Sequence, residues 1–262
     1  MKLTIAIAQI NIVLGEPRIN EEKISDFTEK AAVAGADVIV YPEMWNTGYA
    51  LDKLQTLADK EGVMSKDLLS RLATKYHINI VGGSVAIKQH TDFYNTMYIY
   101  NRLGQKISQY SKVHLFGLMS EGQYLTSGSQ KTSFMVDDIP STGVICYDIR
   151  FPEWIRTLMS DGPKQLLFVA SEWPVQRIQQ WQILLQARAV ENQTFVIAAN
   201  RVGKDQQNTF GGSSMIIDPL GNIIARGSSQ NEELVLAIVD TADEQAVRGE
   251  IPVFNDRRIE LY

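Results

Sequence analysis

Apolar and polar residues alternate along the chain in blocks that predict strands and helices by turns. Short apolar runs that predict buried strands lie at residues 3–8, 38–41, 78–87, 165–170, 195–199, 214–217 and 234–239. Apolar residues repeated every three or four positions predict helices at residues 20–34, 65–76 and 178–192, the first of them capped by Asn20. Polarity alternates in residues 94–100 and 106–113 around a glycine-containing turn, as in a β-hairpin. Strands that alternate with helices and hairpins predict an α/β domain with a mixed sheet.

The chain is expected to form one domain that comprises residues 1–262, because no linker or low-complexity segment divides it. Its last segment, residues 241–262, begins with a short helical stretch and ends in a run that is too apolar to remain in solvent. We therefore expect this C-terminal tail to pack on its own subunit or on a partner subunit.

Composition and charge exclude several classes of function. The net charge of −5 gives no electrostatic support to a nucleic-acid or anionic-membrane partner. No apolar run reaches the roughly 18 residues that span a bilayer, and the N-terminal segment lacks a signal-peptide cleavage site, so a cytoplasmic protein is predicted. One cysteine excludes an intrachain disulfide. Because the cysteine, histidines and carboxylates lack the spacing of metal ligands, we expect neither a metal nor another cofactor.

The single cysteine, Cys146, is the first candidate for catalysis. It follows the β-branched pair Val144 and Ile145, and Pro152 a few residues later suits the first turn of a helix. A thiol where a strand passes into a helix has backbone N–H groups and the positive end of a helix dipole nearby. These favour a thiolate and can stabilise an oxyanion. Taken alone, a lone cysteine is more often a small buried hydrophobic residue.

Two further reactive side chains occupy strand ends like that of Cys146. Glu43 follows the apolar strand at residues 38–41, and Lys112 lies at the exit of the second hairpin strand. A carboxylate can take the thiol proton, and a lysine ammonium can neutralise the oxyanion that forms when a thiolate attacks a carbonyl. The three side chains together indicate acyl transfer, although each by itself could be an ordinary structural or surface residue.

A histidine is the other possible base, because cysteine hydrolases usually take the thiol proton with an imidazole. Of the three histidines, His77 follows a helix and His90 precedes the hairpin. Only His114 lies near the exit of a predicted strand. A pair of Cys146 with His114 therefore stays open beside the alternative in which Glu43 is the base.

The segments around these residues resemble the Glu, Lys and Cys signatures of the nitrilase superfamily, the carbon-nitrogen hydrolases. The matching positions run along nearly the whole chain and include, besides the three candidates, Tyr94, Asn95, Glu121, Tyr124, Gly128, residues 187–192, Asn200, Arg201 and residues 256–258. The resemblance implies a four-layer α-β-β-α sandwich that is commonly dimeric, so a homodimer is expected. It also implies that Glu43, Lys112 and Cys146 are catalytic, with Glu121 beside the lysine to orient it or the substrate.

The residues around Cys146 and Glu172 look like those of the omega-amidase branch, which deaminates small dicarboxylic mono-amides such as 2-oxoglutaramate or 2-oxosuccinamate through a thioester. A nitrilase, a deaminated-glutathione amidase or an N-carbamoyl hydrolase would use the same triad. A binding module or an inactive dimerising relative is the non-enzymatic alternative. The residues expected to contact substrate are Tyr147, Trp173, Glu172, Phe116 and Arg150. Arg150 could bind a substrate carboxylate or pair internally with Asp148 and Glu153.

Overall fold

The computed structural model describes residues 1–162 and 164–261. Tyr262, the last residue of the expected C-terminal tail, lies outside the described residues.

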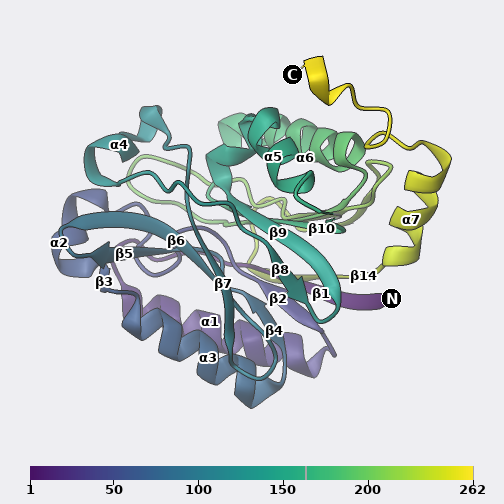
Figure 1. Ribbon diagram of the computed structural model, residues 1–262. Helices are drawn as coiled ribbons and strands as arrows, with labels where there is room; N and C mark the ends of the chain where they lie inside the picture. The colour runs from purple at the N-terminus through teal and green to yellow at the C-terminus, as the bar shows by residue number, and fades with distance from the viewer. Residues whose placement is uncertain (163, 262) are drawn as a thin grey trace.

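Two mixed β-sheets form the centre of the molecule (Figure 1). The first sheet has the order β14-β1-β2-β4-β6-β5-β3, with β7 also paired to β6. Its strands are β1 (Lys2–Gln9), β2 (Val38–Val40), β3 (Asp59–Lys60), β4 (Asn79–Val81), β5 (Val85–Gln89), β6 (Asp92–Tyr100), β7 (Lys106–Ser111) and β14 (Glu233–Asp240). The second sheet has the order β13-β12-β11-β10-β9-β8, in which β9, β10 and β11 are parallel. Its strands are β8 (Phe134–Val136), β9 (Ile139–Ile145), β10 (Leu166–Ser171), β11 (Phe195–Asn200), β12 (Met215–Ile217) and β13 (Ile223–Arg226).

Helices cover the outer face of each sheet. The long helices α1 (Pro17–Val33) and α3 (Val63–Tyr76) lie against the first sheet, and α5 (Pro152–Met159) and α6 (Ile178–Asn192) lie against the second (Figure 1). The short helices α2 (Leu54–Leu57) and α4 (Glu121–Tyr124) belong to connections, and α7 (Thr241–Glu250) follows β14. The four layers run helix, sheet, sheet, helix, which confirms the expected α-β-β-α sandwich.

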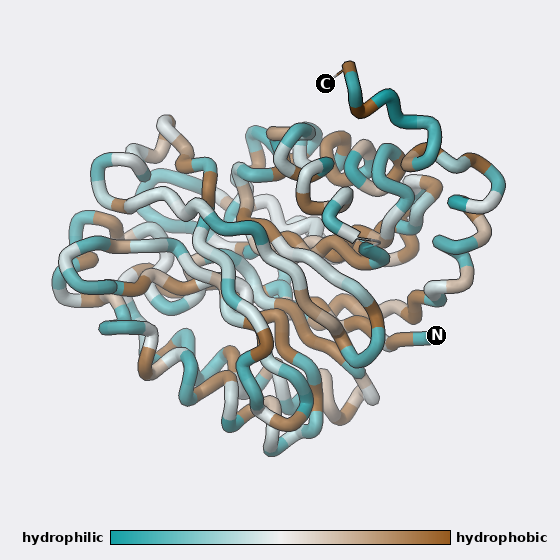
Figure 2. Tube along the Cα trace, in the orientation of Figure 1, coloured by the Kyte–Doolittle hydropathy of each residue, from teal (hydrophilic) through white to brown (hydrophobic). Residues whose placement is uncertain are grey.

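The period of two along a strand explains why the two sheets pack face to face. On β1, Ile5 and Ile7 enter the core between the sheets, which Val144 of β9 shares. Ala6 and Ala8 point the other way, into the core beneath α1 and α3. The small alanine side chains let the helices approach the sheet closely. Figure 2 shows the hydrophobic stretches concentrated along the central strands.

Two predicted boundaries differ from the structure. Asn20 does not cap the first helix, because α1 already begins at Pro17, a residue that needs no amide partner in the first turn. Asn20 is buried and exchanges two hydrogen bonds of 2.8 Å with the backbone of Val13. The strand expected at residues 78–87 divides into β4 and β5 at Gly83, where φ is 59° and a Cβ atom would lie 2.2 Å from a carbonyl oxygen.

The C-terminal tail packs on its own chain over its first half. Gln193 donates a hydrogen bond of 2.6 Å to the carbonyl of Ile251, and the guanidinium of Arg248 lies 5.1 Å from the ring centre of Phe254. Arg257 still donates a hydrogen bond of 2.6 Å to Ser160 Oγ. The last residues then lead away from the body of the molecule (Figure 1), and Ile259 is 68% exposed. Within the described residues, no helix is long and apolar enough to cross a membrane.

Candidate active site

Three of the predicted catalytic residues follow strand ends that meet where the two sheets face each other. Lys112 comes directly after β7, Cys146 directly after β9, and Glu43 shortly after β2. The ammonium of Lys112 lies 2.8 Å from Oε1 of Glu43 and 2.7 Å from Oε1 of Glu121, and all three side chains are fully buried. The thiol of Cys146 lies beside Glu43, and the two groups interact electrostatically. The structure therefore brings the four predicted catalytic residues into one cluster.

Glu43 is held at both of its oxygens. Oε1 accepts hydrogen bonds from Asn95 Nδ2 at 2.8 Å and from Lys112, and Oε2 accepts one from the backbone N–H of Glu172 at 3.1 Å. Burial raises the pKa of Glu43, and the charge of Lys112 opposes this rise. A carboxylate with a raised pKa and a fixed orientation is a suitable general base for the Cys146 thiol.

Glu121 lies in the connection between β7 and β8, as the first residue of α4. Its Oε2 accepts a hydrogen bond of 2.9 Å from the backbone N–H of Phe116, so the turn itself orients the carboxylate toward Lys112. Burial alone favours a neutral amine, but Glu43 and Glu121 together raise the pKa of Lys112 above its ordinary value. The lysine is thus a permanent cation at neutral pH.

Tyr49 is a member of the cluster that the sequence interpretation missed. Its hydroxyl lies 2.9 Å from Oε1 of Glu43, 2.6 Å from Oε1 of Glu121 and 3.4 Å from the ammonium of Lys112. A phenol has one hydrogen, so it donates to one carboxylate at a time. Burial and the two carboxylates raise the pKa of Tyr49 well above its ordinary value, so the hydroxyl keeps that hydrogen.

The backbone at Cys146 forms a sharp elbow. Its φ of 48° lies in the left-handed region, which a residue with a Cβ rarely adopts. A short 3-10 helix, Cys146–Arg150, begins at the cysteine itself. The buried carboxylate of Asp148 stabilises this elbow, because Oδ2 accepts hydrogen bonds from the backbone N–H of Ile145 at 3.0 Å and from Tyr110 at 2.7 Å. Asp148 therefore helps to fix the position of the cysteine.

The protonation state of Cys146 differs from the expectation. The sequence interpretation took the strand-to-helix junction to favour a thiolate, but burial and the neighbouring Glu43 raise the pKa of the thiol well above its ordinary value, against the lowering effect of Lys112. The thiol is therefore neutral at rest. A base has to take its proton at the moment of attack.

His114 is oriented away from this role. Its Nδ1 lies 2.7 Å from Oδ1 of Asp148, and its ring stacks on Phe151 at a centroid distance of 3.8 Å. Glu43, in contrast, interacts with the Cys146 thiol. The geometry thus favours Glu43 over His114 as the base.

A narrow cavity opens beside Cys146. It is lined by Tyr49, Phe116, Met119, Cys146, Tyr147, Arg150, Glu172, Trp173, Pro174 and Arg177, which include all five residues expected to contact substrate. Arg150 donates to Gln180 at 2.6 Å and stacks over Trp173 at 4.8 Å. The carboxylate of Asp148 is occupied by His114 and Tyr110, so the internal pair considered for Arg150 with Asp148 is not what the structure shows.

Arg177 is a second cation on the cavity wall that the sequence did not reveal. Its guanidinium lies 5.5 Å from the ring centre of Phe116. Nothing in the local sequence distinguishes it from a solvated arginine at the start of a helix. Only the position of the turn after β10 places it near Cys146.

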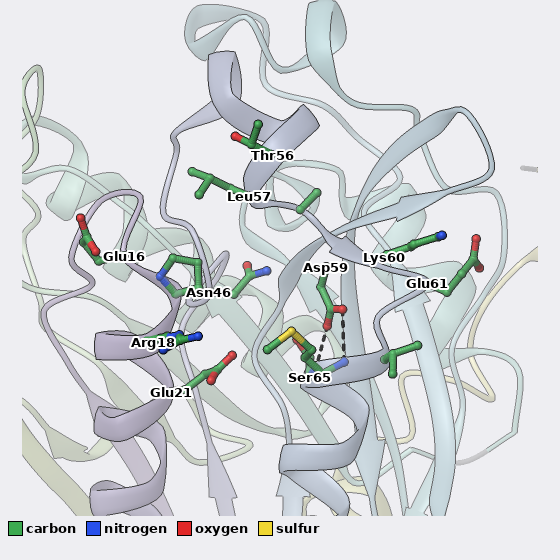
Figure 3. Close-up of a pocket in the computed structure, with 14 residues that line it drawn as sticks. Glu16, Arg18, Glu21, Asn46, Thr56, Leu57, Asp59, Lys60, Glu61 and Ser65 are labelled. Carbon is green, nitrogen blue, oxygen red and sulfur yellow. Dashed lines mark hydrogen bonds between the residues drawn. The ribbon is translucent and has the colours of Figure 1, made fainter.

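A cavity of about 790 Å³ lies elsewhere (Figure 3). It is formed by the start of α1 and by residues 56–65, and Figure 3 shows Asp59 accepting hydrogen bonds at the start of α3. None of the four predicted catalytic residues lines it. The volume of a cavity alone would therefore not have pointed to the cluster. Among the described residues, no group of three His, Cys, Asp or Glu side chains could hold a metal ion.

Comparison with known proteins identifies the family. The family description "Carbon-nitrogen hydrolase" matches residues 4–249. The chain belongs to this family. It is 47% identical over 262 residues to the 2-oxoglutaramate amidase of Bacillus subtilis (strain 168), with all of both chains covered.

Solved structures agree with this assignment and place the carbon-nitrogen hydrolase in the nitrilase superfamily. A CN-hydrolase superfamily protein of Xanthomonas campestris superposes with a TM-score of 0.92 at 25% identity, covering 98% of this chain and 97% of that one. A variant amidase of Nesterenkonia sp. AN1 superposes with a TM-score of 0.87 at 25% identity, covering 99% and 98%. In that amidase acrylamide has added to the active-site cysteine.

Proposed function

We propose that this carbon-nitrogen hydrolase is an amidase that converts the terminal amide of a small dicarboxylic mono-amide, such as 2-oxoglutaramate, to an acid and ammonia. The observation that carries the proposal is the contact of Glu43 with both the Cys146 thiol and the Lys112 ammonium inside a buried site. These three residues supply a nucleophile, a general base and a cation that stabilises an oxyanion, which are the groups that acyl transfer requires.

In the acylation step, Glu43 takes the proton of Cys146 as sulfur attacks the amide carbonyl. The C–S bond forms and the carbonyl electron pair moves onto oxygen. Lys112 has three N–H donors, of which two point to Glu43 and Glu121, and the third reaches only Tyr49, at 3.4 Å. We infer that this third donor, with the backbone N–H of Tyr147, stabilises the oxyanion.

The tetrahedral intermediate then expels ammonia. Glu43 gives its proton to the nitrogen as the C–N bond breaks, which leaves a thioester on Cys146. A water molecule transfers a proton to Glu43 and attacks the thioester carbonyl. As the C–S bond breaks, Glu43 passes that proton to the departing sulfur. One carboxylate thus serves both half-reactions, and the sum is amide plus water to acid plus ammonia.

The arginines of the cavity support an anionic substrate. Arg150 and Arg177 both line the cavity that contains Cys146, and a guanidinium matches the geometry of a carboxylate. A dicarboxylic mono-amide carries a carboxylate at the end opposite the amide. The similarity to the 2-oxoglutaramate amidase of Bacillus subtilis supports the same substrate class.

The proposal is tested with purified protein and a panel of omega-amides, nitriles and N-carbamoyl compounds, with ammonia release as the measurement. We expect omega-amides to be the best substrates and hydroxylamine to divert the thioester to a hydroxamate. Cys146→Ala should fold and yield neither product. Ammonia release from the wild type without any acyl adduct or hydroxamate would show direct attack by water and overturn the thioester route.

Two further expectations are a homodimer, which the family resemblance implies, and a cytoplasmic location, which the sequence pattern predicts. Sedimentation of the purified protein and fractionation of cells would test them.

A further inference from the structure

Glu172 is a second buried glutamate beside the catalytic cysteine. It follows β10 directly, and its backbone N–H donates to Oε2 of Glu43. The residue lines the same cavity as Cys146, and its side chain has no exposed surface. The catalytic cycle proposed above assigns no task to its carboxyl group.

The two oxygens of this carboxyl group have different surroundings. Oε2 accepts a hydrogen bond of 3.0 Å from Nη1 of Arg201. Oε1 is buried and has no hydrogen-bond partner among the described residues. An unpaired polar atom in a buried site is costly, which makes Oε1 a candidate for contact with a ligand.

Arg201 cannot readily turn to serve Oε1 as well. It donates to the carbonyl of Ile12 and to Oδ1 of Asn11, and its guanidinium lies 4.1 Å from the ring centre of Phe210. These contacts fix the arginine on the Oε2 side. A proton on the carboxyl group therefore resides on Oε1.

The charged groups around Glu172 decide whether that proton is present. Burial raises the pKa of Glu172 to about 8; Glu43 and Asp205 act in the same direction, and Arg201 opposes them. The other titratable groups on the cavity wall are Tyr49, Cys146, Tyr147, Arg150 and Arg177. At neutral pH the carboxyl group is mainly an acid that donates through Oε1.

The next residue has a similar unused donor. Trp173 lines the same cavity, and its indole Nε1 is buried with no hydrogen-bond partner among the described residues. An indole N–H can only donate. Two neighbouring residues on the cavity wall therefore offer donors that have no acceptor among the described residues, and an oxygen of a bound substrate can supply one.

We propose that Oε1 of Glu172 donates a hydrogen bond to the 2-oxo oxygen of the substrate, so that Glu172 makes the enzyme prefer a 2-oxo omega-amide over the unsubstituted omega-amide. The inference rests on the proposed function, since it names the substrate group that the same site selects. It distinguishes Glu172, which binds substrate, from Glu43, which moves protons.

The test compares kcat/KM for 2-oxoglutaramate and for glutaramate, which differ only in the 2-oxo group. Their ratio cancels the titration of groups that act on both substrates, such as Glu43 and Cys146. With a pKa of about 8, the protonated fraction of Glu172 falls from about 0.9 near pH 7 to about 0.1 near pH 9. We expect the wild-type preference to fall by about tenfold over this range.

Glu172→Gln provides the matched variant, because its amide keeps a donor at the position of Oε1 and an acceptor toward Arg201 but does not titrate. Its preference should stay constant with pH. Glu21→Gln, a partly buried glutamate in the large cavity of Figure 3, should keep the wild-type pH dependence. All variants meet the same substrate solutions, so pH effects on the substrate itself cancel.

The outcomes separate this inference from the proposed function. If glutaramate is hydrolysed but the wild-type preference for 2-oxoglutaramate over glutaramate does not change with pH, Glu172 does not bind the 2-oxo group. This result would overturn the inference. The wild-type series decides this even if Glu172→Gln fails to fold. If neither amide is hydrolysed while another compound of the panel is, the proposed function itself fails.

Discussion

Tyr49→Phe is the most direct test of the cluster, because it removes one hydroxyl and little else. That hydroxyl lies 2.9 Å from Glu43 and 2.6 Å from Glu121. A hydrogen bond to a charged group contributes about 1.5–3 kcal/mol. If the bond is made more strongly in the transition state than in the resting enzyme, kcat/KM should fall by about 10- to 100-fold.

The pH profile should move in a defined direction. Glu43 acts as a base only when ionised, so activity is lost as pH falls through its pKa. A donor to the ionised form lowers that pKa, so its removal raises the pKa of Glu43 further above its ordinary value. The acidic limb of kcat/KM in Tyr49→Phe should therefore move to higher pH than in the wild type.

The control for this experiment is Tyr76→Phe, whose hydroxyl lies 3.2 Å from Glu29 at the surface. It loses the same kind of contact without touching the site and should keep wild-type kinetics. Thermal unfolding of both variants checks that the fold is retained. A Tyr49→Phe enzyme within about twofold of wild type, with an unmoved acidic limb, would refute the assigned role.

Two other predictions concern the remaining catalytic groups. Lys112→Met should lower turnover by at least about a hundredfold, because one oxyanion donor is worth roughly 2.7–4 kcal/mol. It also leaves Glu43 buried without the opposing charge of Lys112, so the pKa of Glu43 in the folded state rises further and the melting temperature should fall as pH increases. A melting temperature that does not depend on pH would contradict this. Glu43→Gln should abolish hydroxamate formation, whereas His114→Ala should lower it less, because His114 pairs with Asp148. The reverse order in the trapping assay would favour a Cys–His mechanism.

The sequence pattern by itself predicted an α/β domain with Glu43, Lys112 and Cys146 at strand ends, and the resemblance to a family implied the four layers. Successive apolar residues on β1 face the two cores by turns. The apolar runs before Glu43 and Cys146 place both residues at strand ends. The strands β2 and β9 belong to different sheets, so the packing of the two sheets face to face brings these strand ends together. The placement of these residues could be predicted because strand period and strand end are local properties of the chain.

The tertiary structure decided which side chains complete the site and in which protonation state. Tyr49 and Arg177 lie in connections whose polarity pattern is ordinary, and only the meeting of two sheets brings them to Cys146. The raised pKa of the Cys146 thiol reverses the expectation from the helix dipole, because desolvation acts only after all four layers have assembled. The same burial leaves one oxygen of Glu172 without a partner. The sequence pattern indicates which face of an element a residue occupies. The exclusion of water from that residue and its contacts with the second sheet arise only when the chain folds.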